Sequence, residues 1–123
     1  MRFTKLIPNI FYADIQVGYR LFVDCLGFTI AYEEKHGEPF AVIVRDDLKV
    51  HLVQSPEFAA KDRPEIRIET DDIEAAYASI KDRFPQLLHP NALAIKRQPW
   101  GPLEFALRDE SDVCVIIVQW DDV

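Results

Sequence analysis

The sequence lacks the long apolar runs and the basic excess that would tie a protein to a membrane or to nucleic acid. No apolar stretch approaches the roughly 18 residues of a membrane span. Acidic residues outnumber basic ones, 21 against 14, so the formal net charge is −7. This charge disfavours nucleic acid and anionic membranes as partners and favours a cationic one. The first residues do not resemble a secretion signal, so we expect a cytoplasmic protein.

The chain is also poor in the residue types that supply nucleophiles and metal ligands. It has two cysteines and three histidines, and neither Cys25 nor Cys114 lies in a nucleophile or zinc-binding pattern. Without a secretion signal we expect free, buried thiols, although the sequence alone leaves a disulfide open. We expect His36 at a hairpin tip and His89 in a loop, both at the surface. The sequence therefore indicates no covalent catalyst.

What the chain does contain is an internal duplication. A fixed offset of 58 residues aligns segment 6–26 with segment 64–84. The matched pairs are Ile10 with Ile68, Asp14 with Asp72, Ile15 with Ile73 and Tyr19 with Tyr77. Self-similarity at this scale indicates a duplicated supersecondary unit. With 123 residues and 49% hydrophobic content, the chain can bury a real core.

Each copy is typical of a strand followed by an amphipathic helix, because apolar residues recur at three- and four-residue intervals. Asp14 is expected to cap the first helix, and Asp71 with Glu74 gives the second a variant of the capping box. Gly27 and Pro85 are expected to end the helices. The apolar stripes are Ile15, Tyr19, Phe22, Val23 and Leu26 in the first copy and Ile73, Ala76, Tyr77, Ile80 and Phe84 in the second.

Three short β-branched or aromatic runs follow each helix. They span residues 28–33, 40–45 and 49–54 in the first copy, and residues 93–96, 103–108 and 113–120 in the second. The order is therefore β-α-β-β-β, twice. We predict a single domain of residues 1–123, with module one at about 5–55 and module two at about 63–121. The polar segment 55–63 joins them.

Two segments resemble signatures of the vicinal-oxygen-chelate superfamily, which includes glyoxalases, bleomycin-resistance proteins and dioxygenases. The run DIQVGYRLF at 14–22, closing on CLGF at 25–28, is similar to the first-helix signature. The run PWGPLEFALRD at 99–109 is similar to the second-module signature, especially among bleomycin-resistance-like members. The resemblance implies an α+β fold of two tandem βαβββ modules that form an open, curled, barrel-like cleft. One departure is Asp112, where the family usually has glycine, but aspartate tolerates a left-handed turn at some cost.

The resemblance also implies where the metal-dependent members place four ligands, on the first and fourth strands of each module. In this chain those positions hold Ile7, His51, Glu65 and Ile116. Isoleucine offers no lone pair, and a pair such as His51 and Glu65 normally achieves only weak metal binding. We therefore expect no cofactor and no catalytic metal.

Strand alternation predicts which side chains face the cleft. Ile66 and Ile68 fit the helix-covered face of their strand, which assigns its other residues to the cleft face. With the repeat, the predicted cleft-facing set is Asn9, Phe11, His51, Val53, Glu65, Arg67, Glu69, Ile116 and Val118. Phe40 and Phe105 would add aromatic surface, and Trp100 lies on a stiff loop that resembles a cleft rim. Isolated polar groups among apolar walls suit an organic ligand.

Several of these residues have a second interpretation. Arg67 would clamp a ligand carboxylate or form a salt bridge with Glu65 or Glu69. Trp100 would contact a ligand or pack against a partner subunit. His51 would be a hydrogen-bonded cleft histidine or a general base. The sequence alone leaves these alternatives open.

Two classes of function follow. The first is a non-catalytic module that binds or sequesters a small organic molecule, with a resistance role only by analogy. Its candidate contacts are Asn9, Phe11, Phe40, His51, Arg67, Trp100 and Phe105. The alternative is a lyase, isomerase or dioxygenase with a reduced metal site, or a metal-free enzyme with His51 and Glu65 as acid and base. We expect binding, and exposed sheet edges lead us to expect a homodimer.

Overall fold

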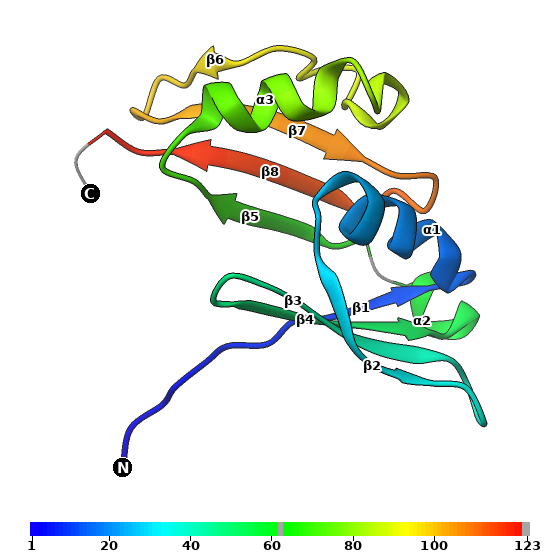
Figure 1. Ribbon diagram of the computed structural model, residues 1–123. Coiled ribbons are helices and arrows are strands. Elements are labelled where there is room, and N and C mark those ends of the chain that lie inside the picture. The colour runs from blue at the N-terminus through cyan, green and yellow to red at the C-terminus, as the bar shows by residue number, and fades with distance from the viewer. Residues whose placement is uncertain (62, 122–123) are drawn as a thin grey trace. The chain divides into compact units, whose positions relative to one another are not determined.

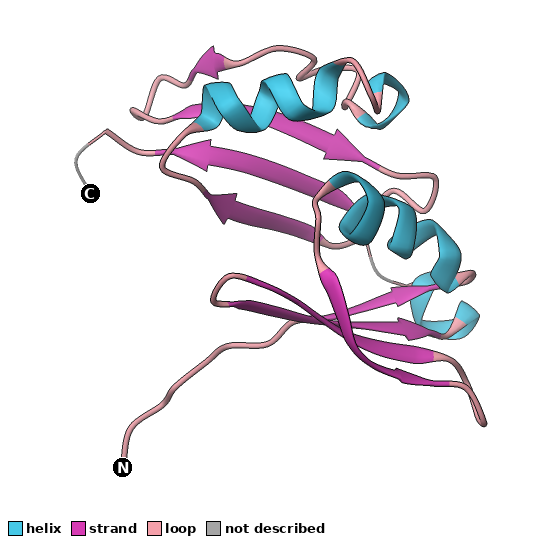
Figure 2. Ribbon diagram, in the orientation of Figure 1, coloured by secondary structure: helices cyan, strands magenta, loops and turns pink. Residues whose placement is uncertain are grey.

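The computed structural model describes residues 1–61 and 63–121. The chain divides into two compact units, Met1–Asp62 and Arg63–Val123, which we call module one and module two (Figure 1). Each module contains a four-stranded sheet and a helix that packs on one face of that sheet (Figure 2). A single domain that comprises both modules stays a prediction.

Module one follows the predicted β-α-β-β-β order. Its elements are β1 (Asn9–Tyr12), α1 (Ile15–Tyr19), η1 (Arg20–Cys25), β2 (Thr29–Glu34), β3 (Phe40–Arg45), β4 (Leu48–Gln54) and α2 (Pro56–Ala59). The sheet order is β1-β4-β3-β2, with β1 parallel to β4 and the other pairs antiparallel. The short helix α2 was not predicted from the polar segment 55–63, although Ser55 before Pro56 is a helix-start signal. Asp62 of that segment lies outside the described residues.

The first helix begins as predicted but changes its winding. The Asp14 carboxylate caps it by accepting a hydrogen bond from the Gln16 amide at 3.0 Å. After one α-helical turn the chain continues as the π-helix η1. Gly18 lies against the buried Tyr12 ring, where a Cβ would come within 2.5 Å of a ring carbon. Gly27 ends the helix as predicted, and its φ of 74° is the left-handed conformation that favours glycine.

Module two repeats this topology. Its elements are β5 (Glu65–Glu69), α3 (Ile73–Lys81), η2 (Pro85–Leu87), β6 (Lys96–Arg97), β7 (Leu103–Arg108) and β8 (Cys114–Gln119). The sheet order is β5-β8-β7-β6, with β5 parallel to β8. Asp112 has φ of 61°, so aspartate occupies the left-handed turn as predicted. The duplication read from the sequence is thus a duplication of sheet topology.

The predicted ends of α3 are wrong. Its N-cap is Asp72 rather than Asp71, because the Asp72 carboxylate accepts a hydrogen bond from the Ala75 amide at 3.0 Å. The helix ends at Lys81, before the predicted stop at Pro85. A proline disfavours helical geometry in the residue before it, and Phe84 accordingly has φ of −134° and ψ of 50°. Pro85 instead begins the 3₁₀ turn η2.

The two cores lie between each helix and its sheet. In module one, Ile10 and Tyr12 of β1 alternate with outward residues and pack with the apolar side of α1 and η1. In module two, Phe105 and Leu107 of β7 are fully buried below α3. Each such side chain stabilises the fold by about 1.5–3 kcal/mol through burial. Neither Cys25 nor Cys114 forms a disulfide, and both are half-buried. Among the described residues, no helix is long and apolar enough to cross a membrane.

Candidate functional site

The sheet face of module one that α1 does not cover, its open face, is rich in aromatic side chains. The strand register places Asn9 opposite His51 and Phe11 opposite Val53, and Val53 is paired in turn with Phe40. Phe11 also lies 5.2 Å, ring centroid to ring centroid, from Phe58 of α2. Asn9 and His51 are therefore polar groups within a largely apolar surface.

The corresponding open face of module two carries a charged cluster. Arg67 of β5 donates a hydrogen bond from Nη1 to Glu104 Oε2 at 2.6 Å, and its Nη2 lies 3.6 Å from Glu65 Oε1. Arg67 is paired with Ile116 of β8, and Ile116 with Ala106 of β7. The arginine side chain thus crosses β8 to reach β7. The salt bridge left open for Arg67 is present, and its closer partner is Glu104.

Residues 88–95, which we call the strap, replace most of the strand predicted at 93–96. Because β6 has only two residues, the strap takes over the neighbouring edge of β7. The His89 amide donates to the Ala106 carbonyl at 2.9 Å, and the Ala106 amide donates to the Ala92 carbonyl at 3.3 Å. The Tyr77 hydroxyl of α3 donates to the Leu93 carbonyl at 2.8 Å. The strap is thus fixed to both the sheet and the helix.

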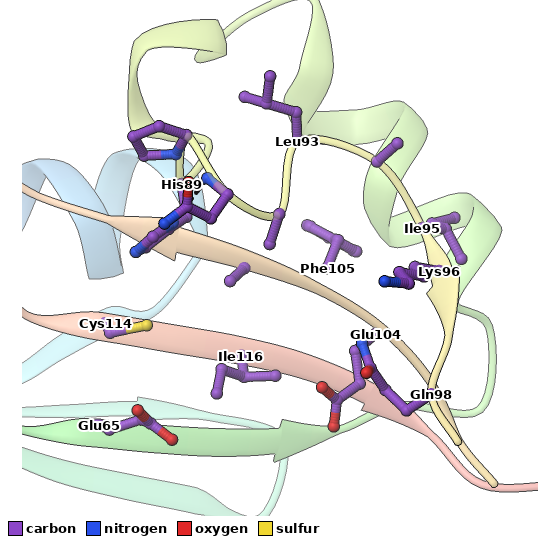
Figure 3. A pocket seen from close by; sticks show the side chains of 15 residues that line it. Glu65, His89, Leu93, Ile95, Lys96, Gln98, Glu104, Phe105, Cys114 and Ile116 are labelled. Carbon is purple, nitrogen blue, oxygen red and sulfur yellow. Dashed lines mark hydrogen bonds between the residues drawn. The ribbon is translucent and has the colours of Figure 1, made fainter. Parts of the chain in front are cut away.

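A pocket of about 640 Å³ lies between the strap and the open face of module two (Figure 3). Its floor includes Glu65, Glu104, Ala106, Cys114 and Ile116. Strap residues, including His89, and the adjoining Lys96 and Gln98 form the rest of the wall. Ligand pockets commonly measure about 300–1,000 Å³ and combine apolar walls with a few polar groups. This pocket has both properties.

The polar side chains of the pocket differ in burial, protonation and hydrogen bonding. Glu104 is the most enclosed, with a side chain only 10% exposed. Burial raises the pKa of the Cys114 thiol, and the Glu65 carboxylate raises it further. Cys114 therefore stays protonated at neutral pH and is a poor nucleophile. His89 Nδ1 accepts a hydrogen bond from the Asn91 amide at 3.0 Å.

A smaller pocket of about 320 Å³ lies in module one, beside the start of α1 and the end of β2. There the Tyr19 hydroxyl donates to Glu33 Oε2 at 2.7 Å, and Lys35 Nζ lies 3.3 Å from Glu33 Oε1. Burial, followed by the hydrogen bond to Glu33, raises the pKa of Tyr19 far above its ordinary range. The same bond, aided by Lys35, lowers the pKa of Glu33. None of the predicted ligand contacts lines this pocket.

The predicted ligand-contact residues lie in different settings. Asn9, Phe11, Phe40 and His51 share the open face of module one, and Arg67 lies on that of module two. Trp100 is 58% exposed in the turn between β6 and β7. It is not among the residues that line the 640 Å³ pocket.

Two sequence predictions about side-chain position need correction. Phe105 borders the pocket, but its side chain is 0% exposed and lies on the helix-covered side, 5.2 Å from the Tyr77 ring. It cannot offer aromatic surface to a ligand. His89, expected at the surface, is half-buried and lines the pocket because the strap folds onto β7. His36 is exposed between β2 and β3, as predicted.

The positions that the family resemblance assigns to metal ligands are poorly suited to a cation. Ile7 precedes β1 and is 37% exposed, and Ile116 is part of the pocket floor. The Glu65 carboxylate already faces the guanidinium of Arg67, whose positive charge opposes a metal ion. In the described parts of either module, no three His, Cys, Asp or Glu side chains gather as potential metal ligands.

The sequence analysis missed Glu104, Lys96 and the strap. Alternation along β7 could have identified Glu104, since it shares a face with Ala106 and opposes Phe105. The family resemblance instead led us to predict the aromatic residues of this segment as ligand contacts. Lys96 pairs with Glu104 in the β6–β7 register, but β6 is too short to show a period-two pattern.

Comparison with solved structures identifies the fold. The chain matches a bleomycin-binding protein from bleomycin-producing Streptomyces verticillus, complexed with copper(II)-bleomycin, with a TM-score of 0.74 and 22% identity over 98% of this chain and 99% of that one. A bleomycin resistance determinant encoded on the transposon Tn5 gives a TM-score of 0.73 and 20% identity, over 97% and 99% of the two chains.

A glyoxylase/bleomycin resistance protein/dioxygenase domain from Frankia sp. EAN1pec gives a TM-score of 0.73 at 11% identity, over 99% of this chain and 94% of that one. The sequence matches no family model and no curated protein. Identities this low establish the fold alone. The chain has the fold of the vicinal-oxygen-chelate superfamily, which confirms the resemblance of its two signature segments.

Proposed function

We propose that this chain is a small-molecule-binding protein that holds an organic ligand in the pocket beneath the strap. One observation carries the proposal: a 640 Å³ pocket joins an apolar floor of Ala106 and Ile116 to the enclosed carboxylate of Glu104. Such a pocket provides contact area for an organic molecule and a polar group that orients it. The structural likeness to a bleomycin-binding protein that contains its ligand supports this class of function.

The ligand's charge and further contacts belong to the same proposal. The net charge of −7 favours a cationic molecule. On module one taken by itself, we propose Asn9, Phe11, Phe40 and His51 as ligand contacts of its open face. Trp100 would contribute from its turn. We also propose a cytoplasmic homodimer, in which a second copy would cover exposed apolar side chains such as Tyr32 and Phe58.

Binding explains the site better than catalysis by His51 and Glu65. The Glu65 carboxylate faces the guanidinium of Arg67, whose positive charge opposes a catalytic metal ion at this position. Cys114 is held as the protonated thiol. Groups that are already paired can still orient a ligand, so the site's chemistry supports recognition.

The direct test is a ligand survey by native mass spectrometry on protein purified without added metal. We expect an organic molecule bound in stoichiometric amount, from cell extract or from a compound library that includes bleomycin and copper(II)-bleomycin. We also expect chelators to leave Tm unchanged, because bound metal would otherwise stabilise the fold. One tightly held metal ion per chain and no organic adduct would refute the proposal.

Trp100 offers a second test. Replacing Trp100 by alanine should weaken a ligand found in the survey by about 1–3 kcal/mol if the indole contacts it. Titration calorimetry would measure the affinity, and sedimentation velocity would measure assembly of the same variant. A variant with unchanged affinity but weaker self-association would assign Trp100 to a subunit interface. Its position outside the pocket lining makes this distinction necessary.

A further inference from the structure

The structure assigns Glu104 a role beyond pocket shape: we infer that it is the counter-ion for a positively charged group of the ligand. The pocket would thus select molecules that carry one ammonium or amidinium group on an apolar body. This inference rests on the proposed function of the pocket. Figure 3 shows the Glu104 carboxylate at the floor, on the same side of the sheet as Ile116.

Burial makes Glu104 the dominant charge of the pocket. A carboxylate removed from water needs a partner of opposite charge, and its electrostatic interactions are stronger than those of an exposed group. The Glu104 side chain is 10% exposed, whereas that of Glu65 is 59% exposed. Water therefore screens the charge of Glu65, whereas the charge of Glu104 acts more strongly on groups inside the pocket.

The internal partner of Glu104 neutralises it incompletely. Arg67 donates to Glu104 Oε2 at 2.6 Å and also faces Glu65 Oε1 at 3.6 Å. One guanidinium between two carboxylates leaves this trio with a net negative charge. A carboxylate also accepts several hydrogen bonds, so Glu104 Oε1 can receive a ligand N–H while Oε2 keeps Arg67. A ligand cation would restore the charge balance.

Lys96 does not replace such a cation. It pairs with Glu104 in the strand register and lines the pocket, but it is exposed to solvent. An exposed ammonium is strongly hydrated, and its interactions are screened by salt. A ligand ammonium inside the pocket would lie in a drier environment. Ala92, Ala106 and Ile116, which pack together, would then receive the apolar part of the molecule.

The test uses three probes that share one apolar body and differ in charge: 1-naphthylmethylamine, 1-naphthalenemethanol and 1-naphthoate. Each would be titrated into isotope-labelled protein, with the amide resonances of Ala106, Ile116 and the strap reporting on the pocket. We expect the amine to bind about ten- to a hundredfold more tightly than the alcohol, since hydrogen bonds to charged groups are the stronger kind. Naphthoate should bind most weakly.

Isosteric variants locate the source of this preference. Glu104→Gln should reduce amine affinity to that of the alcohol and leave the alcohol unchanged. Glu69→Gln is the matched control, because Glu69 is exposed on the same sheet face of β5 and does not line the pocket. That control should keep the amine preference. Arg67→Gln should strengthen amine binding, because Glu104 then loses its internal cation.

The outcomes separate this inference from the proposed function. Equal affinity for amine and alcohol in the wild-type protein, or an amine preference retained by Glu104→Gln, would overturn the role of Glu104 while the pocket remains a binding site. If no probe shifts the pocket resonances, both proposals fail. The wild-type comparison needs no variant, so it decides the matter even if Glu104→Gln fails to fold.

Discussion

Modules one and two share one framework in considerable detail. Asp14 and Asp72, matched by the sequence repeat, both cap the following helix. A glutamine at the end of the last strand, Gln54 or Gln119, accepts a hydrogen bond from the first amide of that helix, at 3.0 Å and 2.7 Å. The duplication therefore preserved hydrogen bonds that fix each helix to its sheet.

The modules diverge directly after the helix. Module one passes through Gly27 into β2, a full strand that pairs with β3. Module two inserts η2 and the strap before a two-residue β6. The matched tyrosines therefore have different hydrogen-bond acceptors. Tyr19 donates to Glu33 of β2, and Tyr77 donates to the Leu93 carbonyl of the strap. The pocket beneath the strap has formed where the copies differ.

The open faces diverge in chemistry as well. In register, Phe40 of module one stands opposite Val53, the residue before Gln54. Glu104 of module two stands opposite Val118, the residue before Gln119. Glu104 is therefore the structural counterpart of an aromatic residue. An enclosed carboxylate at such a position costs free energy unless it is paired, which is consistent with a role in recognition.

The largest expected difference between the modules is in the free energy of unfolding, when Phe105 of β7 or Phe40 of β3 is replaced by alanine. Phe105→Ala should reduce the free energy of unfolding by about 3–5 kcal/mol, because it empties a fully buried site. Phe40→Ala should cost clearly less, since Phe40 is only half-buried on the open face. Urea unfolding would measure both. Equal losses would mean that the open face of module one is covered in solution.

The next effect concerns the matched helix positions Gly18 and Ala76. Gly18→Ala should destabilise the protein by about 1–3 kcal/mol, because its Cβ would meet the buried Tyr12 ring within 2.5 Å. This cost should exceed the gain of about 1 kcal/mol in helix propensity. Ala76→Gly, the reverse exchange in α3, should lose about 1 kcal/mol through propensity alone. A stabilised Gly18→Ala variant would show that α1 can move away from Tyr12.

How much the sequence predicts depends on how local the determining interactions are. The start of the first helix, the positions of β3 and β7 and the left-handed turns at Gly27 and Asp112 follow from local propensities and could be predicted. The π-helix η1 could not, because the apolar periodicity expected of an ordinary helix continues through it. Helix periodicity also gives no warning that α3 ends at Lys81, because Phe84 continues the apolar stripe.

The candidate site was less predictable than the fold for a similar reason. Alternation alone groups Asn9, Phe11 and His51 on one face, because the face of a strand is a local property. The strap, by contrast, is fixed by Tyr77 and by the part of the β7 edge that does not pair with β6, which come from different parts of the chain. Glu104 could not be identified as important from the sequence, because its significance depends on its burial in the folded module.

The two tyrosines allow a smaller and more local test. Tyr77→Phe removes the hydroxyl that holds the Leu93 carbonyl, a hydrogen bond worth about 0.5–1.5 kcal/mol. Amide exchange in the strap should accelerate by the corresponding factor, while exchange in β2 stays unchanged. Tyr19→Phe should leave strap exchange unaltered. Unchanged strap exchange in Tyr77→Phe would mean that the bonds to Ala106 suffice to hold the strap.

The smallest expected effect is on the pH dependence of stability, which should change in Tyr19→Phe and not in Tyr77→Phe. The Tyr19 hydroxyl lowers the pKa of Glu33 below its ordinary value of 4.5, so ionised Glu33 favours the folded state. That contribution is complete above the unfolded pKa and is lost as the pH falls through the lower folded pKa. Tyr19→Phe should therefore lose less stability than the wild-type protein between pH 7 and pH 3, about the range in which carboxylates titrate.

Tyr77 provides the control for this pH dependence, because its hydrogen bond ends on a backbone carbonyl that does not titrate. The urea midpoint of Tyr77→Phe should decline with acid in parallel with the wild-type curve. Tyr19→Phe should begin lower at neutral pH and converge on the wild-type curve as Glu33 becomes protonated. Parallel curves for Tyr19→Phe and the wild-type protein would show that Lys35, the second group facing Glu33, carries the coupling instead.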